Sequence, residues 1–186
     1  MIPPPPKHCT TPSPSTRSDP SPLQYLGRRD IIAHRYAAAL RWLDSALTVD
    51  PGFAIALGHR LRVRLLQGDT AQARRDAQVL AGMGVNDFGL TASALALVEA
   101  HTGDTLAARA RLDRELSTSA VGALGYRRAA WLVVGLVAAG ETERALGLLE
   151  GLRPSRRLWD VLRYPELDAI RSNPRLQRLV EESRPK

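Results

Sequence analysis

Apolar residues recur at helical spacing from about residue 23 to residue 152. The clearest example is Ala39, Leu43 and Ala46, which lie at positions i, i+4 and i+7 and therefore share one face of a helix. Small side chains on that face allow a second helix to approach closely. Asp50-Pro51-Gly52 ends this predicted helix, because a proline disfavours helical geometry in the residue before it. The pattern predicts an all-α chain.

A three-residue turn recurs between the predicted helices. Gly68-Asp69-Thr70, Gly103-Asp104-Thr105 and Gly140-Glu141-Thr142 follow one another at spacings of 35 and 37 residues. A period near 34 residues is typical of helix–turn–helix repeats, in which each unit buries its apolar face by stacking on its neighbours. The spacing predicts about four helix hairpins. The later hairpins are expected to begin near Ala54, Gly89 and Tyr126.

The two ends of the chain differ from this pattern. Residues 1–22 hold eight prolines with serine and threonine but little that is apolar. They are predicted to form a disordered tail, because they bury too little surface to offset the entropy of ordering. Prolines interrupt residues 153–186, which predict two or three short helices. We expect these helices to cap the open end of a repeat domain over residues 23–152.

One predicted helix, from Arg128 to Ala139, is apolar on every face. Such a helix is normally covered on all sides by other parts of the protein. The C-terminal segment that contains Trp159 is the expected cover. The alternative is self-association, so we expect either a monomer or a weak homodimer.

The chain carries a formal net charge of +7, and basic chains often bind nucleic acid. Residues 23–152, however, contain 15 arginines against 13 acids, so the repeats are close to neutral. The densest basic patch combines Arg60, Arg62 and Arg64 with Arg74 and Arg75, and aromatic side chains that could stack on bases are scarce there. A nucleic-acid-binding helical repeat is therefore the weaker alternative.

The sequence shows no arrangement of residues that is typical of catalysis. Its four histidines do not lie at metal-binding spacings, and Cys9 is the only cysteine. The glycines are spread over turns and form no phosphate-binding loop. We expect no enzyme activity, no metal and no cofactor. With no apolar run near 20 residues and no secretory signal, we also expect no membrane partner and a cytoplasmic location.

Residues 20–53 resemble the tetratricopeptide repeat (TPR) family. With Pro20 as position 1, the family's signature positions are filled by Leu26, Gly27, Ala39, Leu43, Ala46 and Pro51. Leu23 and Asp30 depart from the tryptophan and tyrosine that the family prefers at positions 4 and 11. The later units, up to residue 152, are similar mainly in spacing. The resemblance implies a right-handed α-solenoid of about four TPR-like hairpins with a C-terminal helical cap.

In that family the first helix of each hairpin lines a concave groove that binds a peptide or a partner protein. The resemblance therefore implies a non-catalytic scaffold or adaptor. Carried onto this sequence, the groove positions are Gln24, Arg28, Arg62, Ser93, Leu97, His101, Arg127 and Val134.

The expected groove is basic at Arg28 and Arg62, which suits an acidic peptide. An arginine holds a carboxylate through two parallel hydrogen bonds. The alternative is that these two arginines are solvated or pair with Asp30 and Asp69.

The segment from Leu162 to Leu176 resembles the end of the repeat arm in bacterial regulatory proteins. These include winged-helix transcription regulators, class III adenylate cyclases and Ser/Thr kinases. The resemblance implies a second possibility, a C-terminal sensing arm of a larger bacterial regulator. Because the tail leads directly into the first helix, repeats or domains upstream of Met1 would be expected in that case.

Overall fold

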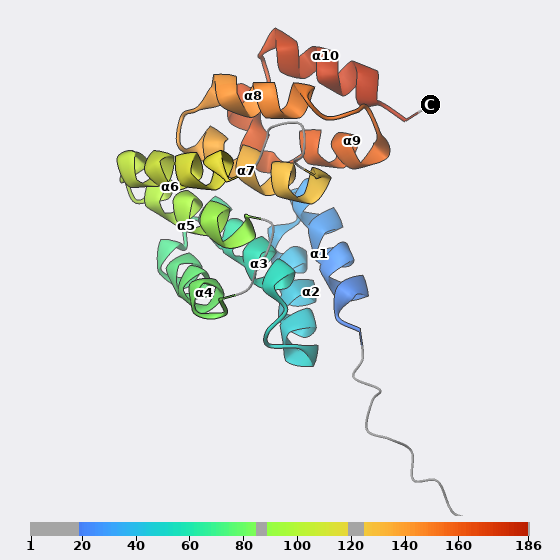
Figure 1. Cartoon of the computed structure of the whole chain (residues 1–186). Helices are drawn as coiled ribbons and strands as arrows, with labels where there is room; N and C mark the ends of the chain where they lie inside the picture. The colour runs from blue at the N-terminus through green and yellow to red at the C-terminus, as the bar shows by residue number, and fades with distance from the viewer. Residues whose placement is uncertain (1–18, 85–88, 119–124, 186) are drawn as a thin grey trace, which may run out of the picture.

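The computed structural model describes residues 19–84, 89–118 and 125–185 (Figure 1). Over these residues the chain forms ten α-helices and one 3-10 helix, without any strand, so the predicted all-α class is confirmed for them. The elements are α1 (Ser21–Ile32), α2 (Tyr36–Val49), α3 (Ala54–Leu66), α4 (Thr70–Gly82), α5 (Leu90–His101), α6 (Thr105–Ser117), α7 (Tyr126–Ala138), α8 (Thr142–Glu150), α9 (Arg156–Leu162), η2 (Pro165–Ile170) and α10 (Pro174–Ser183).

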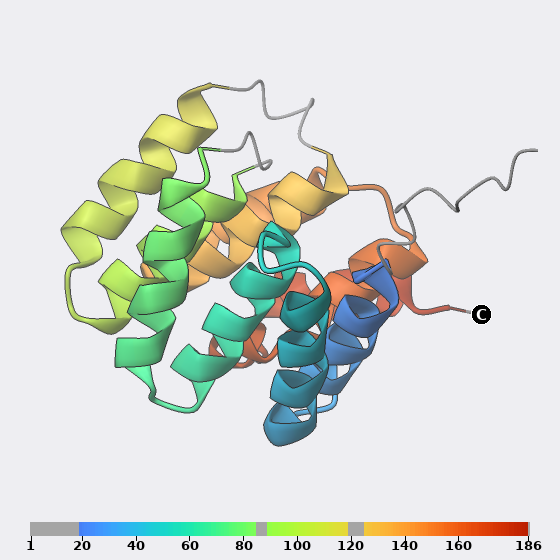
Figure 2. The ribbon, with the colours of Figure 1, turned by 90° about the horizontal axis from the view of Figure 1, so that it is seen from below.

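The first eight helices form four hairpins. In each hairpin the two helices are packed against each other: α1 with α2, α3 with α4, α5 with α6, and α7 with α8. The later hairpins begin at Ala54, Leu90 and Tyr126, within one residue of the predicted starts. Seen from below in Figure 2, the hairpins follow one another in chain order from blue through green and yellow to orange.

The repeated turn has a specific backbone reason. Gly68, Gly103 and Gly140 adopt positive φ angles of 79°, 89° and 78°, a region that glycine occupies without steric cost. In two of the three turns the acid that follows caps the next helix, whereas the Glu141 side chain makes no such hydrogen bond. The Asp69 carboxylate accepts a hydrogen bond from the Gln72 backbone N–H at 3.1 Å, and Asp104 accepts one from Ala107 at 3.0 Å.

The first helices of the hairpins are neighbours of one another. α3 packs against α1 and α5, and α5 packs against α7. At Gly58 of α3 the approach is so close that an added Cβ would lie 2.4 Å from Leu90 and 2.9 Å from Trp131. Glycine at this position therefore allows α3, α5 and α7 to meet.

The apolar helix α7 is surrounded as predicted. It packs against α5, α6 and α8, and on a further side against η2 and α9 of the C-terminal segment. Its residues 131–136 are all buried. The expectation that the C-terminal segment covers this helix is confirmed. Leu158 and Leu167 of that segment are buried, while Trp159 stays partly exposed.

Three short helices occupy residues 153–186, where two or three were predicted. α10 packs against α8 and α9 and begins with Asn173, whose side chain accepts a hydrogen bond from the Arg175 backbone N–H at 2.9 Å. The predicted tail lies outside the described residues up to residue 18, and so do residues 85–88 and 119–124 of the predicted loops. No helix of the described residues is both long and apolar enough to cross a membrane.

Candidate functional site

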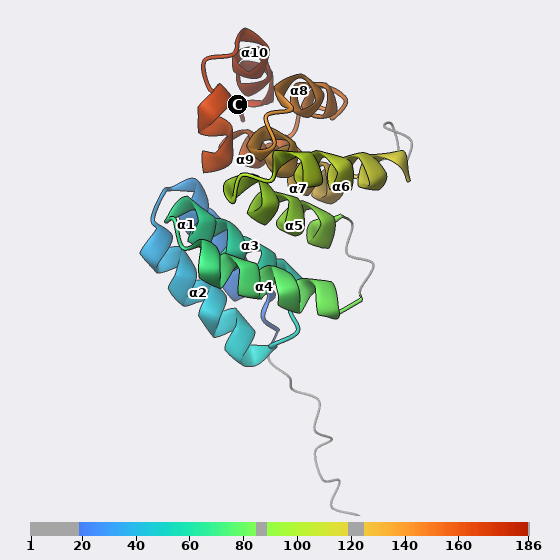
Figure 3. The same ribbon diagram turned by 90° about the vertical axis from the view of Figure 1, so that its left-hand side faces the viewer.

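A cavity of about 230 Å³ opens between α1, α3, α7 and the C-terminal segment. Figure 3 shows the C-terminal segment above α1, and Arg28 of α1 hydrogen-bonds Asp160 of α9, although the two helices are far apart in the sequence. Four arginines line the cavity, and no acidic residue is among the described residues that line it. We call it the arginine pocket. Its lining residues are Gln24, Tyr25, Arg28, Ile55, His59, Arg62, Tyr126, Arg127, Ala130, Trp131, Arg157, Val161 and Tyr164.

Arg62 is the most deeply buried of the four arginines, with 1% of its surface exposed. Its Nε and Nη2 donate hydrogen bonds of 2.6 and 2.7 Å to the two carboxylate oxygens of Glu166 in η2. The guanidinium also lies over two rings, 4.1 Å from the centroid of Tyr164 and 5.4 Å from that of Trp131. Burial would lower the pKa of Arg62, but Glu166 raises it, so the group stays charged.

His59 lies beside Arg62 and is also buried. Its ring is 4.9 Å from that of Trp131, and its Nδ1 lies 3.4 Å from Nη1 of Arg62, which donates to it. Burial lowers the pKa of His59 well below 6.5, and the charges of Arg62 and Arg28 lower it further. This histidine is therefore neutral, with its Nδ1 as an acceptor.

Further carboxylates of the C-terminal segment meet basic groups of the first hairpin. Arg28 donates one hydrogen bond of 3.0 Å to Asp160 of α9. Nε2 of His34, between α1 and α2, lies 3.9 Å from Asp168. Together with Glu166 on Arg62, these contacts place an acidic stretch of the chain against basic groups of its own first two hairpins.

Two polar residues of the pocket, Gln24 and Arg157, have no hydrogen-bond or ion-pair partner for their side chains among the described residues. The Gln24 side chain is 5% exposed, and it makes no hydrogen bond with any described residue. Arg157 of α9 is exposed and pairs with no acid in the described part of the chain. Both face a space already rich in positive charge.

The structure brings together four of the eight groove residues that the sequence suggested. Gln24, Arg28, Arg62 and Arg127 line the same pocket. Ser93, Leu97 and Val134 are buried in the packing between helices, and His101 is exposed at the end of α5, where its Nδ1 bonds the Leu97 carbonyl at 2.8 Å.

The alternative partners expected for Arg28 and Arg62 are wrong. Asp30 instead binds Arg35 at 2.5 Å, and this hydrogen bond holds the pKa of the Asp30 carboxyl below its usual value. Asp69 caps α4. The true partners, Asp160 and Glu166, come from more than 100 residues further along the chain, and no local pattern links them to the two arginines.

Several pocket residues were not anticipated. His59 and Trp131 are not among the groove residues that the family resemblance implied, while Arg157 and Tyr164 belong to the C-terminal segment. The available signal was the concentration of acids and aromatics in residues 159–168. That concentration marked the segment as unusual without indicating where it docks.

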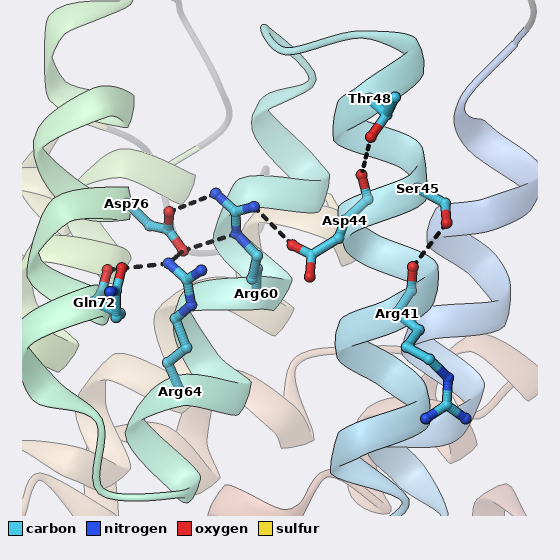
Figure 4. Close-up of polar contacts among 8 residues, drawn as sticks. All are labelled: Arg41, Asp44, Ser45, Thr48, Arg60, Arg64, Gln72 and Asp76. Carbon is cyan, nitrogen blue, oxygen red and sulfur yellow. Dashed lines mark hydrogen bonds and ion pairs between the residues drawn. The ribbon is translucent and has the colours of Figure 1, made fainter.

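The basic patch of α3 is largely neutralised by ion pairs. Figure 4 shows Arg60 between Asp44 of α2 and Asp76 of α4, with hydrogen bonds of 2.8 Å to Asp44 and 2.7 and 3.1 Å to Asp76. Arg64 donates to the same Asp76 at 2.7 Å. With Arg62 bound to Glu166, all three arginines of this run are paired with acids. Arg74 and Arg75 remain exposed on α4.

The described residues hold no group of three or more side chains suited to a metal ion. Comparison of the chain with protein-family models, with curated proteins and with solved structures gave no match.

Proposed function

We propose that this chain is a non-catalytic interaction module that binds a segment of a partner protein in the arginine pocket. The observation that carries the proposal is the pocket itself, which gathers four arginines and five aromatic rings, counting His59, in one open cavity with no acid among the described residues that line it. Arginine, tyrosine and tryptophan are the residues most enriched at the energetic centres of protein interfaces.

We interpret the four hairpins as TPR-like units of a right-handed solenoid with a C-terminal cap. Support comes from the regular hairpin starts, the repeated left-handed turns and the succession of contacts among α1, α3, α5 and α7. In this interpretation the arginine pocket lies on the concave side, because three of those first helices line it.

A nucleic-acid partner finds less support. A phosphate-binding surface needs basic side chains whose charge is not already matched by acids. Arg60, Arg62 and Arg64 are matched in this way, and the side chains of Arg60 and Arg64 are mostly buried. The proposal therefore rests on a polypeptide partner.

A steric block of the pocket tests this proposal. Ala130→Trp introduces a large side chain at a lining position of α7, and Ala71→Trp makes the same change on the exposed surface of α4. The full-length tagged variants and the wild type are captured from cells that express the protein, and the co-captured proteins are quantified by mass spectrometry. Circular dichroism checks that both variants fold.

We expect a partner that is captured by the wild type and by Ala71→Trp but is lost with Ala130→Trp. Equal capture of the partner by both variants would show that the arginine pocket is not its binding site. The absence of any protein enriched over a mock capture would reject the interaction function.

A further inference from the structure

We propose that the arginine pocket binds an acidic side chain of the partner, whose carboxylate contacts Arg157 and displaces Asp160 from Arg28. This inference rests on the proposed function and gives the partner its chemistry. Two of the lining arginines already bind acids, Arg28 to Asp160 and Arg62 to Glu166. Arg157 lines the same cavity and pairs with no acid among the described residues, so the pocket retains a positive charge that attracts an anionic ligand.

A neutral lining group can bind the same ligand. Gln24 lines the cavity and its side chain makes no hydrogen bond to a described residue, but its amide atoms are not sealed from solvent. The amide N–H is therefore open to a ligand that enters the cavity. A carboxylate accepts from an amide N–H and from arginine at the same time.

The two ion pairs within the pocket differ in how readily a ligand carboxylate can replace the acid. Glu166 accepts two hydrogen bonds from Arg62, and the side chains of Glu166 and Arg62 are 8% and 1% exposed. Asp160 accepts a single hydrogen bond from Arg28, and these side chains are 26% and 29% exposed. Partly exposed pairs contribute little stability, so a ligand carboxylate replaces Asp160 at low cost while Glu166 stays in place.

The cavity of about 230 Å³ is large enough to take in a side chain of the partner. Tyr25 lies at the edge of the cavity with its ring 5.6 Å from the Arg28 guanidinium, and it is more than half exposed. It offers a flat apolar surface to the aliphatic part of an entering glutamate.

The test uses the full chain and a matched pair of probes. One probe is a short fluorescein-labelled peptide in which glutamate alternates with leucine, and the other replaces every glutamate with the isosteric glutamine. Binding is followed by fluorescence anisotropy in low salt and again with added sodium chloride. A labelled single-stranded RNA of similar length serves as a third probe.

Three variants separate the pocket from general surface charge. Arg157→Gln removes a lining charge, and Arg156→Gln removes the neighbouring exposed charge of the same helix, which does not line the pocket. Asp160→Asn removes the internal competitor. We expect Arg157→Gln to weaken binding of the glutamate peptide about tenfold, the size expected for a lost hydrogen bond to a charged group. We expect Arg156→Gln to change it less than twofold, and Asp160→Asn to strengthen it severalfold.

The inference is overturned if the glutamine peptide binds as well as the glutamate peptide, or if neither binds at millimolar protein. It is also overturned if the two arginine variants weaken binding equally, or if RNA is the probe whose binding depends on Arg157. None of these outcomes affects the steric test with Ala130→Trp, which detects a partner of any charge. Failure of the inference is therefore distinguishable from failure of the proposed function.

Discussion

Arg62 of α3 and Glu166 of η2, 104 residues apart in the sequence, form a buried ion pair through two hydrogen bonds of 2.6 and 2.7 Å. The pair joins the second hairpin to the C-terminal segment, so that segment is part of the pocket wall as well as a cover for α7.

Glu166→Gln should destabilise the protein by about 3–5 kcal/mol, because it leaves the Arg62 charge buried without its counter-ion. Asp160→Asn removes a partly exposed pair of the same segment and should cost less than about 1 kcal/mol. Urea unfolding followed by circular dichroism measures both changes. Similar losses in the two variants would mean that the Arg62–Glu166 pair does not hold the segment in place.

The stability of the protein should fall as the pH is lowered from about 6.5 toward 5. The folded state keeps His59 neutral, since burial and two nearby arginines lower the pKa of His59. The unfolded chain therefore binds one more proton than the folded chain below pH 6.5, and the free energy of unfolding decreases by up to ~1.4 kcal/mol per pH unit.

The effect of His59 is isolated by comparing variants across that pH range. His59→Gln should show a weaker decline than the wild type, while His101→Gln provides the control for loss of an exposed histidine in α5. An unchanged decline in His59→Gln would assign the pH dependence to other groups.

Gly58→Ala should destabilise the protein by about 1–3 kcal/mol. The new Cβ would lie 2.4 Å from Leu90 and 2.9 Å from Trp131, and both side chains are buried and have little room to move. Gly147→Ala is the matched control in α8, where no atom lies within 4 Å, and it should be neutral or stabilising by about 0.5–1 kcal/mol. Thermal unfolding compares them, and a neutral Gly58→Ala would contradict the close approach of α3, α5 and α7.

Asp76→Asn should cost about 3 kcal/mol or more, since this buried carboxylate neutralises both Arg60 and Arg64 (Figure 4). Asp44→Asn removes the other acid on Arg60, and because Asp44 is 55% exposed its loss should cost at most about 1 kcal/mol. Chemical unfolding of the two variants checks the difference. Equal costs would show that burial of Asp76 does not decide its contribution.

The sequence by itself determined the helices and their grouping into hairpins. Local chemistry suffices for this, since the Gly-acid-Thr turns depend on the positive φ of glycine and on the capping carboxylates of Asp69 and Asp104. Apolar spacing likewise placed the start of each later hairpin within a residue and marked the helix around Trp131 as one that other segments cover.

Only the tertiary structure decided what surrounds the arginines. Arg28 and Arg62 look alike as basic positions in the sequence. In the structure, however, Arg28 donates one hydrogen bond to Asp160 in a partly exposed pair, and Arg62 donates two to Glu166 in a buried pair. Ion pairs between segments more than 100 residues apart depend on how the hairpins stack, and helical periodicity carries no information about that partner choice. The pocket forms where these long-range contacts meet.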